Sequence, residues 1–269
     1  MCELFAMSAR LPATVRMSME EFSRHGGLTG PHKDGWGVAW YEDGDLRVVK
    51  ERAAAADSAC LRFLRDNPFT STFVLGHVRK ATRGAVASRN CQPFARELGG
   101  AWHAFAHNGD LPGIDDALPL RTRRFRPVGE TDSEHAFCAL LERMAVEWDI
   151  DPTPSLDARR AVVEEIADAL RALGPANFLY CDGDTLFVHA DRRHQSDGTI
   201  RPPGLWRLER ACSAGGRFAC EGLDITAHAQ PQQVVLFASV PLTGESWSPM
   251  ERGAVRAVRL GTLPAGHAG

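Results

Sequence analysis

The chain has 269 residues, of which 44% are hydrophobic and 24% charged, and its formal net charge is −3. This composition predicts a globular protein with a sizeable core and argues against a nucleic-acid-binding surface, because no run of Lys or Arg forms a basic patch. No apolar stretch is long enough to span a bilayer, and no secretory leader is recognisable. Seven Cys residues without a CxxC pair indicate neither a disulfide framework nor a structural zinc site, so we expect a reducing, cytoplasmic location.

The first half of the chain predicts short strands separated by two helices. Residues 42–45 read Glu-Asp-Gly-Asp between two apolar runs, which is typical of a two-residue hairpin turn. Ser58 or Asp57 can cap the second helix. The expected strands cover residues 2–6, 37–41, 46–49, 72–79 and 102–107, and the expected helices cover residues 18–24 and 57–66.

Two helices and further strands are predicted in the second half. Thr131 begins a capping box that ends at Glu134, and apolar residues then recur at helical spacing to Trp148. Ser155 can cap a second helix, which Gly174-Pro175 would end. Strands are expected over 177–181, 186–190, 205–209, 234–239 and 254–260, and residues 192–203 as an exposed loop. Successive hairpins favour antiparallel sheets covered by helices, so we expect a single α+β domain over residues 1–269.

Cys2 opens the first predicted strand. Removal of the initiator Met would leave this residue with both a thiol nucleophile and a free α-amine. The pKa of an α-amine, ~8, lies close to that of a thiol, ~8.5, so the amine could act as the base. The alternative is a small hydrophobic residue at the start of a buried strand.

Three later segments place polar residues beside predicted strands or helices. Arg79 stands where a strand ends, which suits either a clamp on a carboxylate or a surface ion pair. Asn108 and Gly109 follow another strand and could form an oxyanion hole or a simple turn. Asp132 lies in a first helical turn, where the helix dipole favours a carboxylate whether or not it binds a substrate ammonium.

These residues together fit hydrolysis of an amide on an α-amino acid. Cys2 would be the nucleophile, Asn108 and Gly109 the oxyanion donors, and Arg79 with Asp132 the pair that binds the amino acid. The sequence also contains several His residues, but they lack the spacing of metal ligands, so no metal and no cofactor are expected. The His residues considered for a metal are His32, His77, His103 and His107.

The sequence resembles the class II glutamine amidotransferases, which are N-terminal nucleophile (Ntn) hydrolases, and within them a stand-alone YafJ/EgtC-like subgroup. Five motifs occur in the order typical of that family. They are Met1-Cys2, Asp34-Gly35-Trp36-Gly37, the stretch from His77 through Asn90-Cys91-Gln92-Pro93, His107-Asn108-Gly109, and Thr131-Asp132-Ser133-Glu134. Two positions depart from the better-known synthases: Arg83 stands where a His is common, and Cys91-Gln92 replaces Ala-His.

The resemblance implies a four-layer αββα sandwich of two antiparallel sheets, the Ntn-hydrolase fold. It implies that Cys2 attacks glutamine or a γ-glutamyl compound to give a thioester, that Asn108 and Gly109 bind the oxyanion, and that Arg79 and Asp132 bind the amino acid. His77 and Trp36 lie within the matching motifs and are expected beside the substrate.

The family's synthases carry a second domain that uses the ammonia, and we expect none in this chain. An ammonia-accepting partner enzyme and a homodimer both stay open, as do hydrolysis of a different amide and a non-catalytic, regulatory role.

Overall fold

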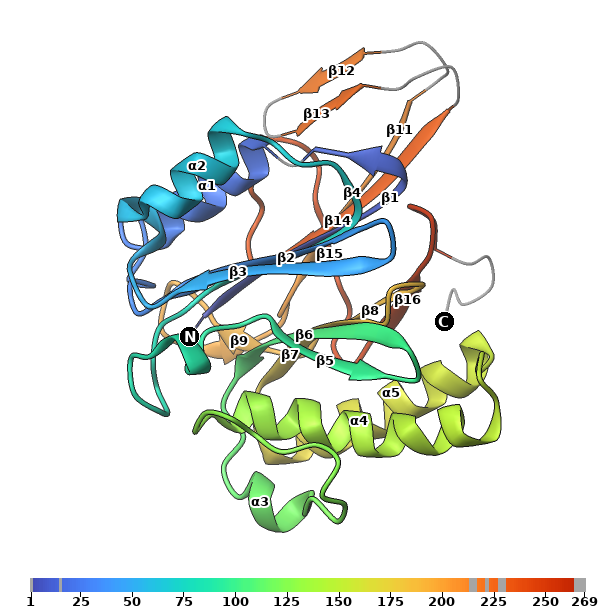
Figure 1. Cartoon of the computed structure of the whole chain (residues 1–269). Helices are drawn as coiled ribbons and strands as arrows, with labels where there is room; N and C mark the ends of the chain where they lie inside the picture. The colour runs from blue at the N-terminus through green and yellow to red at the C-terminus, as the bar shows by residue number, and fades with distance from the viewer. Residues whose placement is uncertain (1, 15, 213–216, 221–222, 227–230, 264–269) are drawn as a thin grey trace.

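The structure is a computed structural model that describes residues 2–14, 16–212, 217–220, 223–226 and 231–263 (Figure 1). Two antiparallel sheets lie face to face, and a pair of helices covers the outer face of each (Figure 1). The larger, seven-stranded sheet has the order β15 (Ser248–Pro249), β11 (Trp206–Cys212), β14 (Gln232–Ala238), β1 (Glu3–Ala13), β4 (Ser71–Val78), β2 (Trp36–Glu42) and β3 (Asp45–Glu51). The five-stranded sheet has the order β16 (Val255–Val258), β8 (Leu186–His189), β7 (Ala176–Cys181), β6 (Ala101–Gly109) and β5 (Phe94–Leu98).

Three hydrophobic clusters fill the three interfaces between these layers. Phe22 of the helix α1 (Arg16–His25) packs with Phe5 on the outer face of the larger sheet. Leu4 and Ala106 belong to the cluster between the two sheets. Phe137 belongs to the cluster between the smaller sheet and its helices. Neighbouring residues of β1 enter different clusters because side chains alternate along a strand. The predicted αββα sandwich is therefore confirmed.

The helices begin where local capping chemistry predicts. The hydroxyl of Ser58 accepts the Leu61 N–H at the start of α2 (Ala59–Asp66). Thr131 caps α4 (Asp132–Ile150) and Ser155 caps α5 (Leu156–Leu173) in the same way. The capping box is only half formed, because the Glu134 carboxylate instead accepts the Gly129 N–H at 2.7 Å and binds Arg96 at 2.5 Å. Short helical turns cover α3 (Ile114–Ala117), η1 (Ala55–Asp57) and η2 (Ser88–Asn90).

The β2–β3 hairpin is confirmed with the predicted turn. Glu42 pairs with Asp45, so the turn consists of Asp43 and Gly44, whose φ values are 53° and 82°. Two successive positive φ values match the right-handed twist of the strands, and Asp-Gly adopts them at low cost.

Three expectations about the strands were wrong in detail. β1 continues to Ala13 instead of ending at Ala6, since Ser8 is buried and pairs with Phe73 and Val235. Strand β5 was not predicted. The loop 192–203 is not wholly exposed, because it contains the ribbon of β9 (Arg193–His194) and β10 (Ile200–Arg201), and Arg193 is buried. A second ribbon is formed by β12 (Arg217–Cys220) and β13 (Leu223–Thr226).

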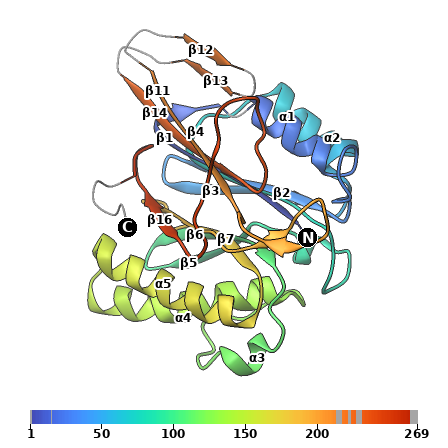
Figure 2. The same ribbon diagram turned by 180° about the vertical axis from the view of Figure 1, so that it is seen from behind.

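The sheet order makes β1 the middle strand of the larger sheet. β1 lies between β14 and β4, and its N-terminal end meets the space between the two sheets beside β9 (Figures 1 and 2). Among the residues described, no helix has the length and apolar character needed to cross a membrane.

Candidate active site

Cys2 lies against the backbone that follows β4. Its sulfur is 3.4 Å from the Lys80 N and 3.5 Å from the Lys80 carbonyl oxygen. The residue is half-buried. Burial raises the pKa of the Cys2 thiol, while the Lys80 N–H and the Arg79 charge oppose that rise and Asp132 adds to it. Both charged residues predicted to bind substrate are thus electrostatic neighbours of the predicted nucleophile. Met1, whose removal the mechanism requires, lies outside the described residues.

Arg79 is buried instead of forming a surface ion pair. Only 3% of the Arg79 surface is exposed to solvent. The guanidinium donates to the carbonyl oxygens of Arg83, Gly84 and Ala85 at 3.0, 3.2 and 3.1 Å, which shapes the loop after β4. A guanidinium has five N–H donors, so two remain after these three bonds. In the described residues no carboxylate pairs with this buried cation.

Asp132 is the buried first residue of α4 and fixes the segment after β6. Its Oδ2 accepts the Leu111 N–H at 2.9 Å, and its Oδ1 accepts the Ser133 N–H at 2.8 Å. The carboxylate has no cationic partner within the described ranges. As predicted, the N-terminus of α4 favours the negative charge of Asp132. The two hydrogen bonds leave part of the acceptor capacity of the carboxylate unused.

Asn108 and Gly109 are the last two residues of β6 and do not form a turn. Asn108 pairs with Asn177 of β7, and Gly109 with Ala176. Asn108 is fully buried, and neither its Oδ1 nor its Nδ2 has a hydrogen-bond partner. Because side chains alternate along β6, Asn108 lies on the same face as Ala104 and Ala106, toward the larger sheet. A side chain on Gly109 would overlap the Pro175 carbonyl oxygen, so glycine is required there.

His77 lies on the β4 face that looks toward Asn108, since it pairs with Leu4 of the inter-sheet cluster. It is fully buried, and neither ring nitrogen has a partner in the described chain. Burial and then the Arg79 charge lower the pKa of His77 to about 3. Burial likewise lowers the pKa of His107 to about 4, although its Nδ1 lies 2.9 Å from the Ser133 hydroxyl. His77 is therefore neutral at pH 7 and can offer a hydrogen bond but no charge.

Trp36 is not brought to this group of residues. It pairs with Val78 and packs in the cluster under α1 and α2, on the opposite face of the sheet from His77. Its indole N–H donates to Glu51 at 3.2 Å. It faces a cavity of only about 10 Å³, too small for a substrate. In this placement Trp36 packs in the outer core, and its expected contact with the substrate stays a prediction.

The two glycines beside Trp36 bring other backbone segments close. Gly35 has φ 141°, and a Cβ there would lie 2.5 Å from the Cys91 sulfur. A Cβ on Gly37 would overlap the Gln92 carbonyl oxygen. The glycines of this motif are needed for close packing of the residue 90–93 segment against β2.

Several supporting residues were not singled out from the sequence. Glu130 accepts the Ala85 N–H at 3.3 Å and the Asn90 amide at 2.9 Å, which ties the loop after β4 to the segment before α4. Gln92, at the position where the synthases have His, accepts the His107 N–H at 2.6 Å. Asn177 donates to the Asn108 carbonyl oxygen at 3.2 Å. Their partners lie 15 to 69 positions away in the sequence, so no local pattern could have revealed them.

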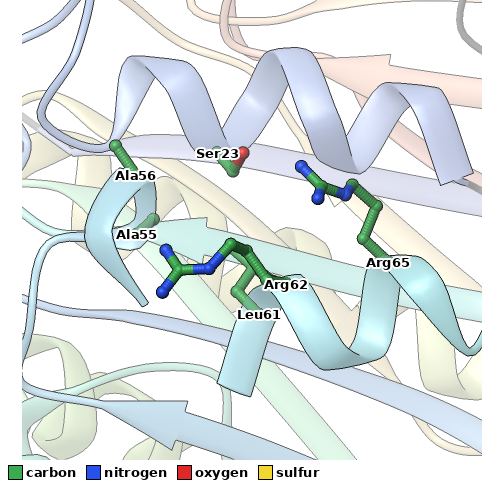
Figure 3. Close-up of a pocket in the computed structure, with 6 residues that line it drawn as sticks. All are labelled: Ser23, Ala55, Ala56, Leu61, Arg62 and Arg65. Atoms are coloured by element: carbon green, nitrogen blue, oxygen red, sulfur yellow. The ribbon is translucent and has the colours of Figure 1, made fainter. Parts of the chain in front are cut away.

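A separate pocket of about 70 Å³ lies between the two outer helices of the larger sheet. The Arg65 side chain extends from α2 toward α1, which supplies Ser23, and the Arg62 side chain extends toward Ala55 and Ala56 of η1 (Figure 3). The lining residues of this pocket include no cysteine and none of the predicted site residues. Nowhere in the described residues do three His, Cys, Asp or Glu side chains gather in a way that could hold a metal ion.

A four-layer sandwich with a cysteine directly before its central strand is typical of the N-terminal nucleophile hydrolases. The family model of the class-II glutamine amidotransferases matches residues 1–267, and the chain belongs to this family.

The chain is 36% identical to the protein YafJ of Escherichia coli strain K12 over 265 residues, which cover 97% of this chain and 98% of YafJ. The 2.0 Å crystal structure of a predicted glutamine amidotransferase from Pseudomonas aeruginosa PA01 superposes with a TM-score of 0.68 at 31% identity, covering 98% of this chain and 100% of that one. A glutamine phosphoribosylpyrophosphate amidotransferase from B. subtilis shares the fold with a TM-score of 0.60 at 16% identity, covering 97% of this chain and 48% of that one.

Proposed function

We propose that this protein is a γ-glutamyl amidohydrolase, which uses Cys2 to release ammonia or an amine from glutamine or a γ-glutamyl compound. The family assignment supports amide chemistry on glutamine. The site supports the finer statement, because Cys2 has a buried cation and a buried anion as electrostatic neighbours, and β6 carries a buried amide without hydrogen-bond partners on the face toward the larger sheet.

The charges of Arg79 and Asp132 carry this proposal. Both residues are buried, both influence Cys2, and neither pairs with the other or with another charged side chain in the described structure. Burying an unpaired charge costs several kcal/mol. A ligand with a carboxylate and an ammonium group would offset both costs at once. The α-amino and α-carboxylate groups of a glutamyl substrate supply this pair and leave its γ-carbonyl to be placed at Cys2.

The chemistry would proceed in two steps. The α-amine of Cys2, freed by loss of Met1, takes the thiol proton while the sulfur attacks the γ-carbonyl carbon. The Asn108 amide and the Gly109 N–H donate to the oxyanion of the tetrahedral intermediate. The amine then returns the proton to the leaving nitrogen, which departs as ammonia or an amine and leaves a thioester. Water attacks the thioester, and glutamate and the free thiol are released.

The position of Asn108 supports its part in these steps. Leaving both polar atoms of a buried amide without partners costs roughly 1–3 kcal/mol for each group. A γ-carboxamide oxygen would satisfy the donor, and more strongly once it becomes an oxyanion. The neutral His77 on the facing strand can accept or donate a hydrogen bond in the same space without adding a charge.

A product screen tests the proposed function. Purified protein with Met1 removed, as verified by intact mass, is incubated with glutamine and with a panel of γ-glutamyl peptides, and glutamate release is measured. We expect release from at least one of them, and a Cys2→Ala protein should release none. Absence of glutamate from every substrate, from a protein whose Cys2 is free and reactive, would contradict the proposal. Release of ammonia from glutamine would further support an ammonia-accepting partner enzyme in the cytoplasm.

A further inference from the structure

The aspartate that opens the Asp34-Gly35-Trp36-Gly37 motif has no role in the steps above. The β2–β4 ladder ends at the pair Trp36 and Val78. Beyond it, the Asp34 N–H donates to the Arg79 carbonyl oxygen at 3.0 Å, and the Arg79 N–H donates to the Gly35 carbonyl oxygen at 2.8 Å. Two residues after Arg79, the Ala81 N–H donates to the Asp34 carboxylate at 2.8 Å.

These three bonds fasten the backbone on both sides of Lys80. The Asp34 carboxylate thereby extends the sheet pairing by one residue. The bond to Ala81 is charge-assisted, which makes it about twice as strong as a neutral hydrogen bond. Both peptide groups of Lys80 that remain, its N–H and its carbonyl, lie against the Cys2 sulfur.

The protonation state of Cys2 decides which of the two Lys80 groups matters. A thiol can donate to the Lys80 carbonyl oxygen, but a thiolate can only accept, so only the Lys80 N–H stabilises it. The N–H belongs to the Arg79–Lys80 peptide and the carbonyl to the Lys80–Ala81 peptide. A change in the Lys80 backbone that withdrew the N–H, or turned the carbonyl oxygen closer to the sulfur, would be unfavourable for the thiolate. The orientation of both peptides that flank the Lys80 Cα is therefore important for the reactive form of Cys2.

We propose that Asp34 is a positioning residue. By accepting the Ala81 N–H, its carboxylate holds the Lys80–Ala81 peptide and with it the Lys80 backbone, so that the Lys80 N–H stays directed at the Cys2 sulfur and the Lys80 carbonyl oxygen turns no closer when that sulfur is the thiolate nucleophile. The proposal rests on the proposed function only in assigning Cys2 as the nucleophile. Asp34 has two opposite effects on the Cys2 thiolate. Its negative charge, acting through space, disfavours the thiolate, whereas its positioning of the Lys80 N–H favours it.

The test compares Asp34→Asn and Asp34→Ala with Asp43→Asn, an exposed aspartate in the β2–β3 turn where Asn also tolerates positive φ. Alkylation of Cys2 by iodoacetamide is followed by peptide mass mapping across pH. We expect the pH of half-maximal labelling to rise in the order wild type, Asp34→Asn, Asp34→Ala, by about one pH unit in the last. Under the same proposal kcat for γ-glutamyl hydrolysis falls about tenfold in Asp34→Ala, with KM within about twofold.

A purely structural role would lower the melting temperature without moving the labelling midpoint, and that result would overturn the proposal. A midpoint shifted downward would overturn it too, because it would mean that the Asp34 charge acts through space. Should Asp34→Ala fail to fold, the Asp34→Asn midpoint decides alone. The labelling measurement needs no substrate. If the wild type hydrolyses nothing, the proposed function fails, while the labelling midpoints still decide the role of Asp34.

Discussion

Two polar clusters flank the first residues of β1, and they differ in how completely they are paired. On one face, Cys2 neighbours Arg79 and Asp132, whose charges have no oppositely charged partner among the described residues. On the other face, the buried Glu3 carboxylate lies 2.7 Å from His25 and 3.7 Å from Arg193. Arg79, Asp132 and Glu3 are all buried, so the contrast between them does not come from solvation.

The difference distinguishes a structural cluster from a functional one. The Glu3 cluster joins α1, β1 and β9 through charges that satisfy one another, so it needs no ligand to be stable. On the proposed function, the Arg79 and Asp132 charges are paired only when the ammonium and carboxylate of the substrate bind. This comparison predicts that substitutions on the Cys2 face mainly cost activity, and that substitutions on the Glu3 face mainly cost stability.

The largest effect is expected from Cys2→Ala. Removing the nucleophile should lower hydrolysis by at least about a thousandfold, while circular dichroism shows an intact fold, because the Cys2 side chain makes only weak sulfur contacts. Cys60→Ala is the matched control, since Cys60 is also half-buried but lies on α2. Near-normal turnover by Cys2→Ala would contradict the assignment of the nucleophile.

Asn108 and Asn177 provide a second contrast, because they are equally buried and face each other across β6 and β7. Asn108→Ala should lower kcat roughly 100-fold, as loss of an oxyanion donor does, with little change in the free energy of unfolding. Asn177 makes three hydrogen bonds, to the carbonyl oxygens of Asn108 and Arg192 and from the Asp191 N–H. Asn177→Ala should therefore lower the free energy of unfolding by about 3 kcal/mol.

Urea unfolding and steady-state kinetics on both Asn variants check this pair. If Asn108→Ala proved as destabilising as Asn177→Ala, the amide would be a structural group and not an unoccupied donor.

Arg79→Lys and Asp132→Asn test binding of the amino acid. Loss of a charge-assisted hydrogen bond to the ligand should raise KM roughly 10- to 100-fold, because Lys cannot reproduce the planar guanidinium. Arg47→Lys serves as control, since its ion pair with Glu42 at 3.5 Å is exposed and should contribute little. A KM that stays unchanged in both test variants would show that another pair binds the substrate.

The smallest expected effect is on stability, comes from the Glu3 and His25 pair, and depends on pH. Although burial alone would raise the pKa of Glu3, its hydrogen bond to His25 and the charge of His25 bring it below the usual 4.5. The hydrogen bond to Glu3 raises the pKa of His25 above 6.5 against the effect of burial. The pair therefore stabilises the fold fully between these two usual values. Its contribution falls at lower pH as Glu3 takes up a proton, and at higher pH as His25 loses one.

Glu3→Gln should consequently reduce the free energy of unfolding by about 2–3 kcal/mol near pH 5.5 and by less at pH 8.5. Denaturant unfolding at several pH values measures this difference. A stability loss that is the same at every pH would mean that the Glu3 and His25 charges contribute nothing.

Local chemistry made much of the fold predictable. Ser58, Thr131 and Ser155 cap their helices as their side chains require, and Asp43-Gly44 forms the predicted turn. Cys2 and its charged neighbours Arg79 and Asp132 could be singled out from the sequence because a family motif contains each of them. In each case the signal lies within a few residues of the chain.

The remaining errors have a common physical cause. In a four-layer sandwich both faces of a central strand are buried, as they are along β2, so hydrophobic alternation does not show which face Trp36 occupies. The buried Arg193 and the Gln92 bond to His107 depend on contacts that only the folded chain brings together. Polar character alone suggested exposure for Arg193, and its Glu3 partner lies 190 positions earlier.

The most direct measurement is covalent trapping of the site by 6-diazo-5-oxo-norleucine, an electrophilic analogue of glutamine. Peptide mass mapping of the wild type should place a single adduct on Cys2 of a chain that lacks Met1. Excess γ-glutamyl substrate should prevent the reaction, and Arg79→Lys and Asp132→Asn should slow it at low reagent concentration. An adduct on another cysteine, or a protein that hydrolyses substrate while retaining Met1, would contradict the account.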